Sequence, residues 1–203
     1  MAFRAYVLQN NVSVDSSRPV TIEELSALGL KVVIFNDSQD PEQAARKLVQ
    51  EWGYPLEKDC VVPFDFRQDA ANSPEVKILY LSRMPDMHSY RQISNLLAQL
   101  VQLIENPTFA FPVELAGFVS YSSMYLDVED IKSKRWIRIY PGPGQLYRAS
   151  AGLKIRVPLT DQNRNHFGTV FCKNGVSSIG IIPEKDLDNH AARQVYLNSI
   201  EMV

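Results

Sequence analysis

The first third of the chain contains two segments in which apolar residues recur at helical spacing. Thr21 and Glu24 form a capping-box pattern before the first segment, and Gly29 follows its end. An aspartate followed by a proline, Asp40 and Pro41, is a typical helix start, because Asp caps the helix and Pro fits its first turn. The apolar face of this second segment recurs at Ala44, Ala45, Leu48 and Trp52, and Gly53 follows it. The pattern therefore predicts helices over 21–29 and 40–53, with short strands at 5–9, 31–35 and 60–62.

The pattern becomes strand-like after Pro107. Apolar residues alternate with others at Phe109, Phe111, Val113 and Leu115. Short apolar runs bounded by turn residues predict further strands at 117–128, 136–140, 153–158, 167–172 and 177–182, and a closing helix over 186–201. Before Pro107, residues 66–74 are turn-forming, 76–81 read as a strand and 86–104 as a long helix. The expected fold class is mainly β with helices (α+β), in one domain spanning 1–203.

Composition narrows the class of protein. The chain has 203 residues, 45% hydrophobic and 22% charged, which is ordinary for a globular protein. Its formal net charge of -2 gives no global attraction to nucleic acid or to an anionic membrane, and no run reaches the length of a membrane span. The two cysteines, Cys60 and Cys172, form no CxxC pair, so a reduced thiol pair is expected. The basic run at 132–136 follows three acidic residues, and we interpret it as a solvated hairpin loop.

Three stretches of the chain resemble the acireductone dioxygenase (ARD) family, metal-dependent members of the cupin superfamily that act in methionine salvage. They are Arg18–Leu30, Asp40–Tyr54, and the most specific one, Met124–Val128 followed by Trp136–Tyr140 and Gly144–Gly152; Ala192, Arg193 and Tyr196 match weakly. The resemblance implies a cupin-type β-barrel with helices of the N-terminal half packed on it. An apparent insertion and a lengthened helix, over 64–106, depart from the family.

The resemblance also implies where a metal would lie. The family holds Fe(II) or Ni(II) with three histidines and one glutamate, and a count without gaps from Asp127 puts these positions on Phe109, Phe111, Leu115 and Ile155. The family's arginine falls on Gly117. A shift of one residue offers Glu114, but one carboxylate does not hold such an ion. The three histidines, His88, His166 and His190, fit none of the positions. We therefore expect a degenerate member with no metal, no cofactor and no catalytic residue.

Functions from different classes stay open at this point. The absence of a ligating residue at all four metal-ligand positions favours a pseudoenzyme that is a structural or scaffold subunit of a larger assembly. Its expected partners are proteins, and neither nucleic acid nor membrane. Its location is expected to be cytoplasmic or cytoskeletal, for example in a cilium, while the N-terminus leaves a mitochondrial presequence open. The alternatives are the family's enzyme, which cleaves acireductone to a 2-oxo acid and formate with dioxygen, and a metal-free cupin that binds a small ligand. We expect residues 64–106 to carry the partner-binding surface.

Overall fold

The computed structural model describes residues 3–10, 12–35, 38–65, 108–122, 125–157 and 166–201. The predicted strand at 76–81, the predicted helix at 86–104 and most of the 64–106 insertion lie outside the described residues, so they stay predictions. Within the described part, no helix is long and apolar enough to cross a membrane.

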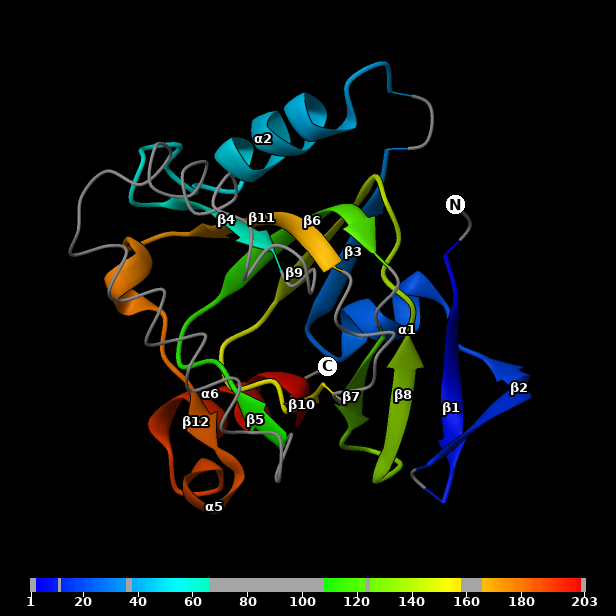
Figure 1. The fold of residues 1–203 in the computed structure, drawn as a ribbon. Coiled ribbons are helices and arrows are strands. Elements are labelled where there is room, and N and C mark those ends of the chain that lie inside the picture. Colours follow the sequence, from blue (N-terminus) through cyan, green and yellow to red (C-terminus); the bar gives the residue numbers. More distant parts are fainter. Residues whose placement is uncertain are drawn as a thin grey trace.

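Two antiparallel sheets form the body of the molecule (Figure 1). Sheet A has the order β12-β5-β10-β7-β8-β1-β2, and sheet B the order β3-β9-β6-β11-β4. The strands of sheet A are β1 (Ala5–Gln9), β2 (Ser13–Pro19), β5 (Thr108–Ala110), β7 (Leu126–Asp130), β8 (Arg135–Ile139), β10 (Ile155–Arg156) and β12 (Ile182–Pro183). Those of sheet B are β3 (Leu30–Ile34), β4 (Val61–Asp65), β6 (Leu115–Ser122), β9 (Gln145–Ala149) and β11 (His166–Cys172).

The helices pack on these sheets. They are α1 (Ile22–Ala27), α2 (Pro41–Glu51), α5 (Glu184–Leu187) and α6 (Ala191–Glu201), with a 3-10 turn, η2, at Val176–Ser178. Figure 1 shows α2 lying along sheet B, and α5 and α6 at the opposite end of the molecule. Ala45 and Val49 of α2 pack in one apolar cluster with Phe118 of β6 and Phe171 of β11. The predicted packing of N-terminal helices on a β-rich body is therefore confirmed.

One apolar cluster fills the space between the two sheets. It takes Val128, Ile137, Ile139 and Ile155 from sheet A, Leu30, Val32, Val119 and Tyr147 from sheet B, Leu25 and Leu28 from or beside α1, and Tyr196 and Ile200 from α6. The Tyr196 hydroxyl also donates a hydrogen bond to the Leu28 carbonyl at 3.0 Å, which ties α6 to α1. The fold class is thus mainly β with helices, as predicted. No strand pairing among the described residues joins the two sheets into a closed barrel, but the arrangement is compatible with a cupin-type one.

The two N-terminal helices begin and end where the sequence predicts. The Thr21 hydroxyl accepts from the Glu24 amide while the Glu24 carboxylate accepts from the Thr21 amide, which completes the capping box. Asp40 caps α2 by accepting from the Gln43 amide at 3.0 Å. Gly29 and Gly53 follow the two helices with φ of +80°, a conformation that glycine adopts without steric cost.

Four predictions about the strands and the last helix need correction. The segment 117–128 is not one strand, because β6 belongs to sheet B and β7 to sheet A, so the chain changes sheets between them. Residues 177–182 form η2 and only a two-residue strand, and the strand expected over 153–158 is just β10. The closing helix is broken at 188–190 into α5 and α6. The sequence does not predict β2, because most of its residues are polar and show no strand-like apolar pattern. The strand forms by pairing with β1.

A buried carboxylate links three strands of sheet A on the face opposite the core. Asp127 of β7 has no solvent exposure and lies directly opposite Arg138 of β8 and Arg156 of β10. Arg138 makes two hydrogen bonds to it, at 2.7 and 3.0 Å, and Arg156 makes two more, at 3.0 and 2.7 Å. Since neighbouring residues of a strand point to opposite faces, these ion pairs also fix which face of β7 meets the core.

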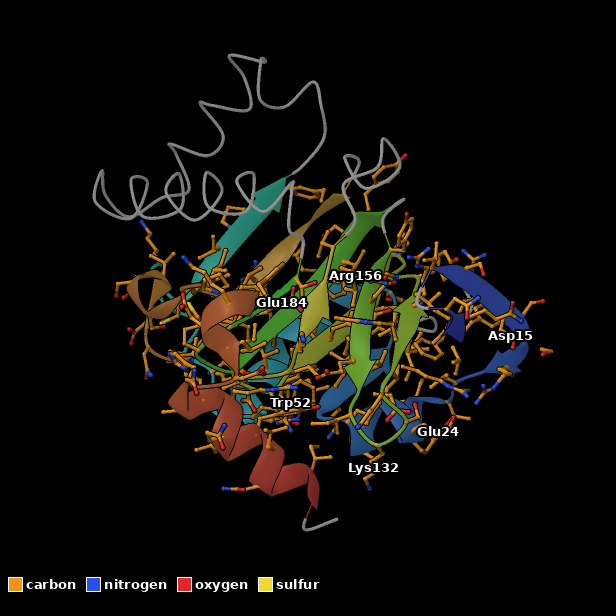
Figure 2. The ribbon with its side chains drawn as sticks, turned by 90° about the horizontal axis from the view of Figure 1, so that it is seen from below. Asp15, Glu24, Trp52, Lys132, Arg156 and Glu184 are labelled. Atoms are coloured by element: carbon orange, nitrogen blue, oxygen red, sulfur yellow. The ribbon has the colours of Figure 1, made fainter. Side chains whose placement is uncertain are left out.

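We expect Asp127→Asn to lower the free energy of unfolding by about 3 kcal/mol, the low end for breaking a buried ion pair, because both arginines keep some contact with water. Urea denaturation measures this loss. Asp15→Asn is the control, since Asp15 lies on the exposed edge strand β2, away from Arg156 (Figure 2). Equal midpoints for wild type and Asp127→Asn would contradict the structural role of this carboxylate.

Candidate functional site

The structure brings two of the four predicted ligand positions face to face. Ile155 of β10 is the antiparallel partner of Phe109 of β5 on one side and of Val128 of β7 on the other. All three side chains therefore share the face of sheet A that meets the core, and Phe109 and Val128 are almost fully buried. Phe109 and Ile155, two positions at which the resemblance implies histidines, are therefore adjacent in space, and both carry hydrocarbon side chains.

The other two positions extend this apolar region toward sheet B. Phe111 is half-buried, and its ring meets that of Phe109 edge to face with 5.4 Å between centroids. It also packs against a second cluster, formed by Leu115 with the buried cysteines Cys60 and Cys172. Phe111 thus connects the cluster around Phe109 and Ile155 to the one around Leu115, so the four predicted positions form one continuous apolar contact region.

These residues do not fit Fe(II) or Ni(II). Both ions take imidazole nitrogen and carboxylate oxygen as ligands, and the side chains of Phe109, Phe111, Leu115 and Ile155 have no donor atom. Gly117, at the position of the family's arginine, is different: a Cβ atom placed there would have no heavy atom within 4 Å. The packed apolar side chains at the four ligand positions therefore do not reach Gly117.

Glu114, the alternative that a one-residue shift offered, belongs to another surface. Its carboxylate accepts a hydrogen bond from the Tyr54 hydroxyl at 2.8 Å and lies 3.0 Å from the Lys173 ammonium and 3.8 Å from the Arg148 guanidinium. Burial by itself raises the pKa of Glu114, but the bonds from Lys173 and Tyr54 and the charge of Arg148 outweigh it and lower the pKa below its usual value. Glu114 is therefore an ionised partner of two cations.

His190 and the two cysteines behave as expected of structural residues. His88 lies outside the described residues, and His166 begins β11. His190 precedes α6, where its Nδ1 accepts from the Ala192 amide at 3.1 Å. Cys60 and Cys172 are free and buried, and burial raises the pKa of both thiols, that of Cys172 to about 12. Such thiols are protonated at neutral pH and are poor nucleophiles.

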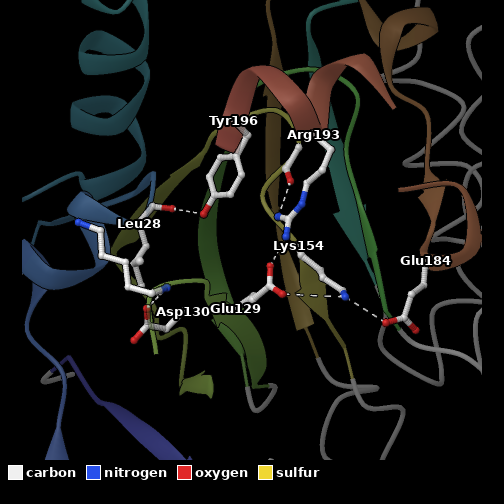
Figure 3. A network of polar contacts seen from close by, with 9 residues as sticks. Leu28, Glu129, Asp130, Lys154, Glu184, Arg193 and Tyr196 are labelled. Carbon is white, nitrogen blue, oxygen red and sulfur yellow. Dashed lines mark hydrogen bonds and ion pairs between the residues drawn. The ribbon is translucent and has the colours of Figure 1, made fainter. Parts of the chain in front are cut away.

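A polar network ties the C-terminal helices to the sheets (Figure 3). Arg193 of α6 donates to the Gly152 carbonyl at 3.2 Å and to the Glu129 carboxylate of β7. Lys154 lies 4.0 Å from the same carboxylate and 3.1 Å from that of Glu184 at the start of α5. Every charge in this network has a partner of opposite sign, so we interpret the network as structural, holding α5 and α6 against the sheets.

Among the described residues, only one group of three side chains could close on a metal ion. Glu57, Asp59 and Cys60 have ligand atoms within 4.8 Å of one another, on the turn before β4. Both carboxylates are exposed, and nothing else at this turn points to an ion. We assign no site to it.

Sequence reasoning missed the cluster that surrounds Trp52 and Tyr54. Lys31 and Arg148 each lie over the Trp52 ring, at 5.1 and 4.9 Å from its centroid, and Lys173 lies 5.0 Å from that of Tyr54. The sequence pattern predicts only that Trp52 lies on the apolar face of a helix. The only signal in the sequence is the pair of aromatic residues on either side of the glycine that ends the helix. The cations come from three distant segments, so no local pattern indicates them.

Comparisons with known proteins give limited information. No family model matches the sequence, and no curated protein matches it. One solved structure of similar shape is an acireductone dioxygenase from Bacillus anthracis with a cadmium ion in its active centre. It is 11% identical, with a TM-score of 0.46, over 91% of this chain and 94% of that one. A likeness at this level does not assign the chain to that family.

We expect Phe109→Ala to lower the free energy of unfolding by about 3–5 kcal/mol and Ile155→Ala by about 2–5, the usual costs of emptying a packed apolar site. The midpoint of chemical denaturation measures both. Val195→Ala is the control, because Val195 on α6 is 69% exposed and its truncation leaves no cavity. An unchanged midpoint for Phe109→Ala would show that this region is not a packed core.

Proposed function

We propose that the chain is a catalytically inactive acireductone-dioxygenase-like cupin that serves as a structural or scaffold subunit of a larger protein assembly. The observation that supports it most is the pairing of Phe109 with Ile155, two buried hydrocarbon side chains at positions where the resemblance would require histidines. A dioxygenase of this kind needs its ion to bind and orient the substrate. The ligand positions of this chain offer it no donor atom.

Without a metal site, a fold of this kind can still act by binding a protein partner. The polar ties of Arg193 and Glu129 hold α6 on the core, and α2 is anchored by buried side chains, so the described part presents fixed surfaces to a partner. A rigid surface loses little conformational entropy on binding. Protein partners in a cytoplasmic or cytoskeletal assembly are the proposed setting, and residues 64–106 remain our proposal for one contact region.

We expect size-exclusion chromatography of the native cell extract to show the protein at an apparent mass far above its own 23.0 kDa. A constant set of other proteins should elute with it in a fixed ratio. A variant that lacks residues 66–83 should still fold, and it should lose some of the co-eluting proteins. The purified protein, supplied with Fe(II) or Ni(II), should consume acireductone no faster than the free ion does. Elution as a monomer together with metal-dependent turnover would overturn the proposal in favour of the dioxygenase.

A further inference from the structure

Sheet B carries a cationic patch beside the end of α2, which we define as Lys31, Trp52, Arg148 and Lys173. Trp52 caps the C-terminal end of α2, and Gly53 then redirects the chain with φ of +80°. Lys31 of β3 and Arg148 of β9 both lie over its ring. The patch is open to solvent: Lys31 is exposed, and the side chains of Arg148 and Lys173 are 32% and 41% accessible.

Lys31 and Arg148 are direct partners across two neighbouring strands. The antiparallel register of β3 and β9 puts them opposite each other, so both side chains rise from the same face. Like charges directly opposite each other destabilise a sheet. The Trp52 ring attracts both cations, but it carries no net negative charge with which to neutralise them.

The charges of this region do not balance. Lys31, Arg148 and Lys173 contribute three positive charges, and the carboxylate that the structure places among them is that of Glu114. Glu114 already accepts from Tyr54 and pairs with Lys173, and Arg148 is at the outer limit of its reach. In the described part of the chain, Lys31 makes no ion pair. Counted over the ion pairs between described residues, a surplus of positive charge therefore remains at the two strands beside Trp52.

We propose that this cationic patch binds a short acidic segment of a protein partner, with its carboxylates on Lys31 and Arg148 beside Trp52. The inference rests on the proposed scaffold function and names one contact of it. A bound carboxylate would neutralise the like-charge pair, and that complementarity favours an anionic partner. A short protein segment fits better than nucleic acid, because three cations beside two rings offer few contacts to a phosphate backbone, whose binding depends on many of them.

Lys31→Glu separates binding from stability. It places an acid opposite Arg148, so the cross-strand repulsion becomes attraction and the melting temperature should rise or stay unchanged. The probe is a fluorescein-labelled octapeptide of glutamate, and fluorescence anisotropy at low salt measures its Kd for the full-length chain. We expect Lys31→Glu to raise this Kd by about tenfold or more, because the bound carboxylates lose a cation and meet an acid.

Two further variants control for total charge and for sign. Lys185→Glu makes the same change of charge on α5, at the end of the molecule opposite α2 (Figure 1), and should change Kd by less than about twofold. Glu114→Gln removes the competing carboxylate, so it should tighten peptide binding. Rising salt should weaken binding by the wild-type chain.

The proposal is overturned if the peptide does not bind the wild-type chain, or if Lys31→Glu binds it as well as Lys185→Glu does. It is also overturned if a single-stranded oligothymidylate of eight nucleotides binds more tightly than the peptide and loses its affinity in Lys31→Glu, which would make the patch a nucleic-acid site. A chain that elutes in an assembly but fails these tests keeps its scaffold function and loses only this contact. Metal-dependent turnover of acireductone would instead remove the scaffold function, whatever the peptide result.

Discussion

The cross-strand contact between Phe109 and Ile155 is the packing on which the arrangement of sheet A depends. β5 and β10 are only three and two residues long, so each has few backbone hydrogen bonds to hold it in register. Their large apolar side chains provide the rest, by facing each other and Val128 in the main core. Phe111 then carries the contact across to Leu115 of sheet B. In this protein, hydrocarbon joins the strands at the positions where the resemblance would place a metal ion.

The opposite face of the same strands is fixed by charge. Asp127 and its two arginines lie one residue along the strands from Val128 and Ile155, and point away from the core. A slip of register by one residue would put these charges into the apolar core and Ile155 into water, at a large cost on both faces. The apolar contact and the ion pairs therefore specify one register together. Neither of them requires a bound group.

Local signals in the sequence predicted the local elements well. The capping box at Thr21 and the Asp–Pro start at residue 40 depend on neighbours within four residues, and both helices follow them. Long-range pairing was predicted less well: β2 has too few apolar residues to show as a strand, and the change of sheet after β6 has no local marker. The four ligand positions could be numbered because of the resemblance, but their contact depends on register. The surplus charge around Trp52 comes from residues between 31 and 173, so only the fold brings it together.

The predicted ligand positions form a packed apolar region, and we propose that it holds no ion. Elemental analysis tests it most directly, on protein purified from cells grown with added iron and nickel. The exposed turn of Glu57 and Asp59 is removed as a source of adventitious binding by measuring the Glu57→Gln, Asp59→Asn variant as well. We expect far less than one iron or nickel ion per chain in both proteins. About one ion per chain, retained in the variant and in the presence of a chelator, would contradict it, because only a site built from donor atoms holds such an ion.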